Sequence, residues 1–374
     1  MIGSLGIGGA EKLTRWVFEE LEKRGHVNRL WTLREKGHHF EELQHRHKEV
    51  RHLGGSPGTS QVLQAIPILM RLRNELLAFR PDVVHAHLFK TALLTRLAAI
   101  LTGIPVVVTL HRLEYPRVEP LVERIFQQST AAYIVDSRAV GRLLAGWGIA
   151  EARISVIPNA VDPVELDAPG DGARIRREMG IPSGASVVGI IAHLFPEKGH
   201  DFLLESFARA NFPRGQVFLL IVGSGPQRDR LERQAAGLGI GSSVRFTGNR
   251  ADLNDILAAL DLCVLPSRWE GFGIVLAEAL YKNVPVVATR GSGTEEIVED
   301  GVTGSLVDFG DVGALAAALE RGLFDPSWRK ETAAAGREKV LREFTLEALA
   351  SRYEDVYRRV SRGASPSPGG RGSG

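Results

Sequence analysis

Residues 266–280 read PSRWEGFGIVLAEAL and join the end of a short apolar run to the start of a helical pattern. Two glutamates, Glu270 and Glu278, are separated by seven residues, and glycines at 271 and 273 follow the first of them. The glycines place Glu270 in the loop before the helix and Glu278 deeper along it. Free backbone N–H groups at a helix start bind phosphate or sugar oxygens, and glycine permits close approach. The segment therefore predicts a ligand site at the end of a strand.

Runs of β-branched residues alternate with stretches of helical period along almost the whole chain. One series of strands is expected at 82–88, 105–110, 131–137 and 154–159, and a second at 186–194, 216–223, 243–248, 262–267, 285–290 and 304–309. Continuous apolar strands separated by helices are typical of parallel sheets covered on both faces. The pattern predicts an α/β fold with two Rossmann-like, doubly wound domains that face each other across a cleft.

The domain boundaries follow from the turn formers. Residues 158–171 (PNAVDPVELDAPGD) hold three prolines and suit a hinge. We expect an N-terminal domain at 1–160, a C-terminal domain at 161–345, and a helix at 346–361 that packs back on the first domain. The Gly/Ser/Pro-rich residues 362–374 are expected to form a disordered tail.

Several loops of the second domain fall at one edge of its predicted sheet. The loop after the first strand (AHLFPEKG) carries His193 and Lys198, and the loop after the next (IVGSGP) carries Gly223 and Gly225. Ligands of such sheets bind outside the carboxyl ends of the strands. Lys198 is therefore placed where a cation can meet an anionic ligand.

Composition excludes several classes. The 374 residues have no run of about 18 apolar residues, and the net charge of +2 argues against nucleic acid as a partner. The single cysteine, Cys263, favours a reducing cytosol. Residues 1–165 carry 21 Lys and Arg against 17 Asp and Glu. Within this basic half, the helical segment 66–79 suits either a packed crossover helix or a basic amphipathic surface that touches a membrane.

The order and spacing of the motifs resemble the retaining nucleotide-sugar glycosyltransferases of family 4, which have the GT-B fold. The resemblance runs from residue 1 to about 360 and rests on GIGGAE at 6–11, PVVVTLH ending at His111, IPNAVD at 157–162 and the paired glutamates. It implies transfer of a hexose-type sugar from a nucleotide diphosphate sugar to a hydroxyl of a glycan or lipid-linked acceptor. The N-terminal domain would bind the acceptor and the C-terminal domain the donor.

The resemblance also implies roles for individual residues. Glu270 and His111 would act at the donor sugar as catalytic residues, Glu278 would bind the ribose, and Lys198 the diphosphate. The remaining donor-binding positions that it implies are Gly8, Gly9, Gly223, Gly225, Asn249, Arg250, Phe272, Gly273 and Ile274. No carboxylate is assigned as a nucleophile, so a same-face substitution that retains the anomeric configuration is expected. Without an Asp-x-Asp motif, we expect neither a metal nor a cofactor.

Two departures from the family pattern concern His193 and the N-terminus. The family usually has arginine where this chain has His193, so a diphosphate contact there would depend on a side chain that is largely neutral near pH 7. The family also has a short strand directly before the glycine loop, whereas only Met1 and Ile2 precede that loop here. We therefore expect the first strand to be missing and the functional protein to start upstream.

Other functions were weighed against transfer. The alternatives are a degenerate protein that binds nucleotide sugars without catalysis and a GT-B nucleotide-sugar epimerase. A dehydrogenase is not favoured, because this chain lacks the Gly-x-Gly-x-x-Gly spacing that such an enzyme needs. The expected role is in cell-envelope polysaccharide biosynthesis. The expected location is the cytoplasm, with peripheral contact of the N-terminal domain at the inner face of the membrane.

Overall fold

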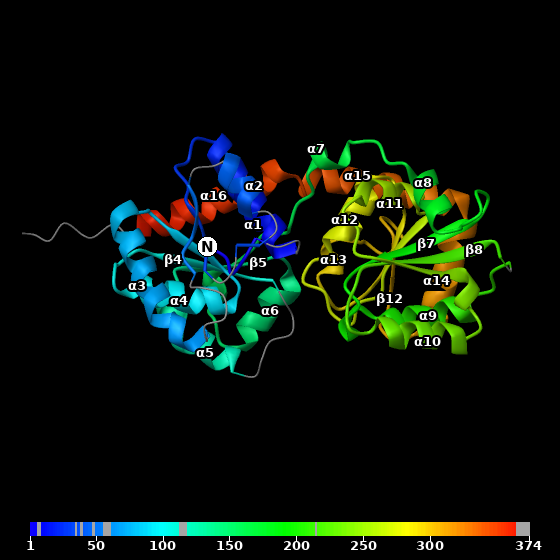
Figure 1. Ribbon diagram of the computed structural model, residues 1–374, viewed down its shortest axis with the longest axis horizontal. Coiled ribbons are helices and arrows are strands. Elements are labelled where there is room, and N and C mark those ends of the chain that lie inside the picture. The colour runs from blue at the N-terminus through cyan, green and yellow to red at the C-terminus, as the bar shows by residue number, and fades with distance from the viewer. Residues whose placement is uncertain are drawn as a thin grey trace, which may run out of the picture. The chain divides into compact units, whose positions relative to one another are not determined.

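The computed structural model describes residues 1–5, 9–33, 36–37, 40–46, 49–54, 61–111, 118–213 and 215–363. The chain divides into two compact units. Unit 1 comprises Met1–Ile157 with Leu346–Gly374, and unit 2 comprises Pro158–Thr345 (Figure 1). The division lies three residues before the expected boundary, and the C-terminal helix belongs to unit 1.

Unit 1 contains a parallel sheet with the strand order β3-β4-β5-β6. Its strands are β3 (Val84–His87), β4 (Val106–Leu110), β5 (Ala132–Val135) and β6 (Ile154–Val156). A second parallel pair is formed by β1 (Leu30–Thr32) and β2 (Val50–His52). The sequence did not predict β1 and β2, because charged residues interrupt the apolar pattern there: Arg29 and Arg34 flank β1, and β2 reads VRH.

Met1 and Ile2 join the two sheets of unit 1. Ile2 forms a parallel bridge with Thr32, and its N–H donates to the carbonyl of Trp31 at 3.1 Å. On the other side the N–H of His87 donates to the carbonyl of Met1 at 2.8 Å. These two residues therefore lie between β1 and β3. They occupy the place of the short strand that the family pattern has before the glycine loop.

The helices of unit 1 form two layers on its sheet. Consecutive steps from β3 to β6 run in one direction, so right-handed crossovers put α4 (Phe89–Ile100), α5 (Glu119–Phe126) and α6 (Arg138–Gly146) on one face. The crossover helix α3 (Gln61–Phe79) packs against α4, as expected for a packed crossover helix. On the other face α1 (Gly9–Lys23) packs against α16 (Leu346–Gly363; Figure 1). No helix within the described residues combines the length and apolarity needed to cross a bilayer.

Unit 2 is a six-stranded parallel sheet with the order β12-β11-β10-β7-β8-β9. The strands are β7 (Ser186–Ile191), β8 (Val217–Val222), β9 (Val244–Gly248), β10 (Leu262–Leu265), β11 (Val286–Thr289) and β12 (Ser305–Val307). The helices that connect and flank them are α7 (Pro163–Leu166), α8 (Gly172–Glu178), α9 (His200–Arg209), α10 (Arg228–Gly237), α11 (Leu253–Ala259), α12 (Ile274–Tyr281), α13 (Thr294–Ile297), α14 (Val312–Phe324) and α15 (Pro326–Glu343). The predicted α/β class with parallel sheets is confirmed.

The strand order of unit 2 locates its ligand crevice. The chain steps from β7 outward to β9 in one direction and then from β10 outward to β12 in the other. The order therefore reverses between the neighbouring strands β7 and β10. In open α/β sheets, ligands bind at such a switch point, outside the carboxyl ends of the strands.

Candidate active site

Lys198 and Glu270 meet at the switch point of unit 2. Lys198 ends a short 3-10 helix in the loop after β7, and Glu270 lies in the loop between β10 and α12. Lys198 Nζ lies 2.7 Å from Glu270 Oε2, and the Ser267 hydroxyl donates to the same oxygen at 3.2 Å. The side chains of Lys198 and Glu270 are 21% and 15% exposed. The two residues therefore neutralise each other in the absence of a ligand while remaining open to solvent.

Neighbouring strands hold this pair in place. The hydroxyl of Thr289, at the end of β11, donates to the carbonyl of Ser267. The N–H of Gly293 donates to the carbonyl of Glu270 at 2.8 Å. Ser267, Thr289 and Gly293 were not predicted as site residues, although each follows or ends a strand at this edge.

Three of the predicted glycines have structural reasons of their own. A Cβ on Gly223 would lie 2.0 Å from the carbonyl oxygen of Ala192, so glycine lets the loop after β8 lie on the loop after β7. A Cβ on Gly225 would likewise lie 2.6 Å from the carbonyl oxygen of Leu194. Gly273 caps α12 in the left-handed region, with φ at 84°. These contacts assemble the loop edge itself, whether or not a ligand also approaches it.

The start of α12 anchors the Glu270 loop in the core. Phe272 is 2% exposed and packs edge to face on Phe344, with ring centroids 5.4 Å apart. Ile274 begins the helix, and Glu278 lies one turn further on, only 4% exposed. Burial raises the pKa of the Cys263 thiol to about 12, and the nearby Glu278 carboxylate adds to this shift. The two glutamates thus lie in different surroundings, one in an open loop and one inside a buried helix.

The loop after β9 places Asn249 and Arg250 differently. Asn249 is exposed, whereas the Arg250 guanidinium is held by two carboxylates. It donates to Asp252 at 2.9 and 2.6 Å and to Glu178 Oε2 at 3.1 Å. These hydrogen bonds raise the pKa of Arg250 and lower that of Asp252. The Arg250 side chain therefore fixes this loop, and the parts left open to a base are its backbone and Asn249.

Two histidines flank Lys198. His193 is exposed, and its ring contacts Phe195 at a centroid distance of 6.1 Å. His200, at the start of α9, is only 2% exposed, and neither ring nitrogen has a hydrogen-bond partner in the described part of the chain. Burial lowers the pKa of His200 to about 4; Asp201 acts in the opposite direction and Lys198 adds to the lowering. Sequence reasoning missed His200, because nothing in the pattern PEKGHD distinguishes a buried histidine from an exposed one.

In unit 1, His111 follows the end of β4. Its Nδ1 lies 3.6 Å from Asp136 Oδ2, and its Nε2 lies 3.5 Å from Nδ1 of His87. Asp136 follows β5 and is 3% exposed. His85 and His87 share one face of β3, with ring centroids 4.2 Å apart, and burial is the main cause of their strongly lowered pKa values. Asp136 and His87 therefore hold His111 at the carboxyl ends of the strands.

The glycine loop is described only from Gly9 onward, and Gly8 lies outside the described residues. Gly9 is the first residue of α1 and is exposed. A Cβ at Gly9 would meet no atom of the described residues within 4 Å. Among these residues, the helix start at Gly9 is therefore open.

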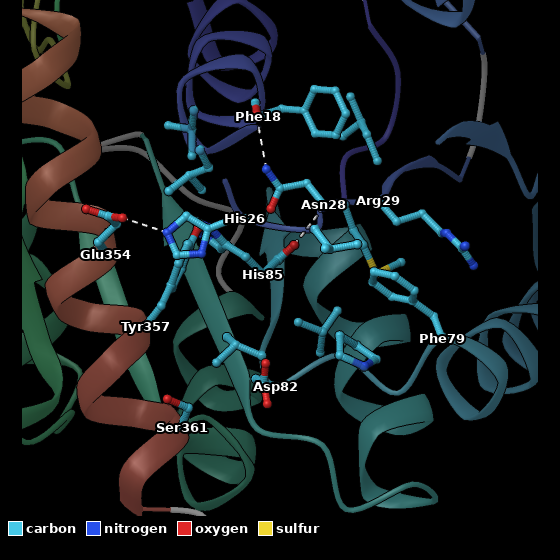
Figure 2. Close-up of a pocket in the computed structure, with 18 of the residues that line it drawn as sticks. Phe18, His26, Asn28, Arg29, Phe79, Asp82, His85, Glu354, Tyr357 and Ser361 are labelled. Atoms are coloured by element: carbon cyan, nitrogen blue, oxygen red, sulfur yellow. Dashed lines mark hydrogen bonds and ion pairs between the residues drawn. The ribbon is translucent and has the colours of Figure 1, made fainter. Parts of the chain in front are cut away.

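A cavity of about 540 Å³ lies elsewhere in unit 1, beside Met1 (Figure 2). Its walls include Asn28 and Asp82, which precede β1 and β3, and so it lies at the amino ends of these strands. At its rim His26 Nε2 lies 2.6 Å from Glu354 Oε1, and Asn28 donates to the carbonyl of Phe18 at 3.2 Å (Figure 2). No predicted site residue lines it. The cavity extends from the amino ends of these strands to His85 and His87 of β3, and His87 contacts His111 of the candidate site.

Comparison with known proteins gives two family matches in chain order. Residues 7–165 match the family described as Glycosyltransferase Family 4, and residues 171–339 match Glycosyl transferases group 1. The first match covers most of the N-terminal part of unit 1 and extends to residue 165, and the second lies within unit 2.

Individual relatives agree with these matches. The chain is 34% identical over 216 residues to the lipopolysaccharide core biosynthesis glycosyltransferase LpsE of Rhizobium meliloti, covering 56% of this chain and 58% of LpsE. It therefore spans less than two thirds of that relative's length. It is 33% identical over 303 residues to the D-inositol 3-phosphate glycosyltransferase of Corynebacterium urealyticum, covering 74% of this chain and 71% of that protein.

Among solved structures, HepE of Anabaena, in complex with UDP and glucose, superposes with a TM-score of 0.82. The match is 24% identical and covers 94% of this chain and 96% of HepE. At this identity the likeness concerns the fold. Together with the family matches, it shows that the chain belongs to the GT-B-fold glycosyltransferases of family 4.

Proposed function

We propose that the chain transfers a hexose-type sugar from a nucleoside diphosphate sugar to an acceptor hydroxyl, with retention of the anomeric configuration. The observation that carries the proposal is the Lys198–Glu270 ion pair, with its 2.7 Å contact at the switch point of unit 2. A cation and a carboxylate held together at strand ends can separate to bind a diphosphate and sugar hydroxyls. The HepE complex with UDP and glucose, in a protein of the same fold, supports this class of donor.

In this proposal the positive charge that faces the diphosphate comes from groups of the protein. Lys198 turns from Glu270 to the diphosphate and offsets the charge that develops on the leaving group. The N-terminus of α12 adds partial positive charge, and no metal is needed. Glu270 accepts hydrogen bonds from sugar hydroxyls.

The other donor contacts are assigned by the surroundings described above. Glu278 binds the ribose, and the backbone of residues 272–274 and of the loops at Gly223 and Gly225 lies along the donor. The backbone of Arg250 and the exposed Asn249 meet the base, because the Arg250 guanidinium is already held by carboxylates. His193, exposed in the loop after β7, donates a hydrogen bond to the diphosphate from a ring N–H.

For unit 1 we assign His111 to the donor sugar and the open helix start at Gly9 to the donor as well. Asp136 and His87 act as positioning residues, because their contacts with His111 fix its ring. The departing diphosphate takes the proton of the acceptor hydroxyl, so no carboxylate nucleophile is required.

The acceptor is a glycan or a lipid-linked glycan, and the product belongs to cell-envelope polysaccharide synthesis. The name of LpsE, a lipopolysaccharide core biosynthesis enzyme, supports this assignment. A lipid-linked acceptor also brings unit 1 to a membrane surface, and this contact is part of the proposal. The glycosyltransferase names of the relatives do not favour an epimerase or a non-catalytic binding protein.

Two measurements test the reaction. Retaining transferases slowly hydrolyse their donor, so incubation with UDP-, GDP- and ADP-sugars in chelator should release one nucleoside diphosphate. Nuclear magnetic resonance of the sugar first released should show the donor's own anomeric configuration. Lys198→Met should abolish the release and the matched surface variant Lys330→Met should not. Inversion of the anomer would contradict retention, and release that requires a divalent metal would contradict the metal-free mechanism.

A further inference from the structure

The helix layer formed by α3, α4 and α5 presents large apolar side chains to solvent. They occur along α3, at the end of α4 and along α5, and their exposure runs from 41% for Leu77 to 72% for Ile66. The full set is Ile66, Met70, Leu77, Ile100, Leu101, Val118, Leu121 and Ile125. We call this set, with the cations between its members, the α3–α5 surface. Single exposed apolar residues are ordinary, but a set carried by three neighbouring helices marks an interaction surface.

On α3 the exposed residues form one stripe. Ile66, Met70 and Leu77 are exposed, at spacings of four and seven residues. Arg73 lies between Met70 and Leu77 in the same stripe. Residues at these spacings share a helix face. The outer face of α3 therefore combines apolar side chains with a long cationic one, whose stem also covers apolar surface.

The polarity of α5 is reversed relative to an ordinary surface helix. Glu119 and Glu123 are 6% and 0% exposed, whereas Leu121 and Ile125 are 60% and 64% exposed. Glu123 faces inward because it forms a bidentate pair with Arg96 of α4, at 3.0 and 2.5 Å. The acidic side of α5 is thus used inside unit 1, and its apolar side is left outside.

The charges of the surface have one sign. Lys90 of α4 and Arg124 of α5 are exposed, and Arg73 on the α3 stripe is half-buried. The carboxylates of the three helices are Glu75, Glu119 and Glu123, and none of them is exposed. Glu75 is half-buried and bonds to Arg29 and Arg51. Over the described side chains of these helices, the surface is therefore apolar and cationic without an exposed carboxylate.

We propose that the α3–α5 surface docks on an anionic lipid bilayer, with its apolar side chains at the headgroup level and its cations on lipid phosphates. A face of this kind gains from apolar burial and from the negative potential of an anionic leaflet together. This inference deepens the membrane contact that forms part of the proposed function. A docked unit 1 would hold the enzyme beside an acceptor carried by lipid.

Co-sedimentation with vesicles tests the proposal without any transfer assay, so its failure and that of the proposed reaction are distinguishable. The full chain should sediment with vesicles that contain phosphatidylglycerol and at least about tenfold less with phosphatidylcholine alone. High salt should release it, because the cations act through screened charge. Equal binding to both vesicles, or no binding to either, would overturn the proposal.

Variants test whether vesicle binding depends on the α3–α5 surface rather than on other exposed apolar residues. Leu121→Asp with Ile125→Asp should lower the vesicle-bound to free ratio at least about tenfold, and Arg73→Gln should lower it about fivefold. The matched controls Val164→Asp and Leu341→Asp change exposed apolar residues of unit 2, and binding should be unchanged. Circular dichroism checks that the variants fold. Equal losses in controls and surface variants would contradict the assignment. Analytical sedimentation without vesicles supplies a second readout. If the chain does not bind vesicles but forms a dimer, and Leu121→Asp with Ile125→Asp makes that dimer dissociate, the surface would be assigned to contact with a second copy.

Discussion

Unit 1 and unit 2 each contain an arginine or lysine paired with a glutamate, and the two pairs lie in opposite surroundings. Arg96 and Glu123 of unit 1 are both 0% exposed, and the Thr130 and Tyr133 side chains complete their hydrogen bonds. Lys198 and Glu270 of unit 2 are partly open at the carboxyl ends of the strands. The buried pair is closed off from ligands and stabilises the fold. In the partly exposed pair, by contrast, Lys198 and Glu270 can each leave the other and contact a ligand. Burial, rather than residue type, separates the structural pair from the functional one.

The largest expected effect concerns the buried pair. Glu123→Gln should lower the free energy of unfolding by about 3–5 kcal/mol, because it leaves the Arg96 guanidinium buried without its counter-charge. Urea denaturation measures the loss. Glu232→Gln, in the exposed helical pair with Arg228, is the control and should cost less than about 1 kcal/mol. Similar losses in the two variants would remove the contrast in burial on which the comparison depends.

The next effect concerns His200 beside the open pair, whose pKa is about 4 in the fold against a usual 6.5. As the pH falls through 6.5 the unfolded chain takes up this proton first. Stability is therefore fully present above that pH and is lost progressively down to about pH 4, by about 3 kcal/mol in total.

Urea denaturation of the wild type and His200→Phe across this pH window isolates the contribution, since His85 and His87 titrate in both proteins. His200→Phe should lose less stability in acid than the wild type. An unchanged slope in His200→Phe would show that this histidine is not buried in its neutral form.

A smaller effect distinguishes the two glutamates of unit 2. Glu278→Ala should chiefly weaken donor binding, and Glu270→Ala should chiefly lower turnover, because one lies in the helix assigned to the ribose and the other in the loop assigned to the sugar. Loss of a hydrogen bond to a charged group costs about 1.5–3 kcal/mol, or one to two decades. Steady-state KM and kcat, with Glu331→Gln as a surface control, measure the split. Parallel changes of both parameters in both mutants would show that the roles are not divided.

The order of strands and helices could be predicted from the sequence, because most strands are continuous apolar runs. All ten predicted strands occur, whereas β1 and β2 were missed, since charged and polar residues in and beside them leave no continuous apolar run. The place taken by Met1 and Ile2 between β1 and β3 was also hidden, because pairing depends on chain segments far apart in sequence.

The site could be predicted in part. Lys198 and Glu270 were both identified from their loops, but their direct contact spans 72 positions of sequence and only the strand order brings them together. Asp136 beside His111 and the buried state of His200 were missed for the same reason. Gly223 was expected for a ligand, and its contact with Ala192 shows that glycine also serves the packing of one loop on another.

The central claim is that the Lys198–Glu270 pair opens to bind a nucleoside diphosphate without metal. Titration calorimetry with UDP, GDP and ADP in chelator tests it most directly, on the wild type, Lys198→Met and the surface control Lys330→Met. We expect at least one nucleotide to bind the wild type and the control alike, and to bind Lys198→Met one to two decades more weakly, as expected for a lost charged contact. Silence from all three nucleotides, or equal binding by Lys198→Met and the wild type, would contradict the account.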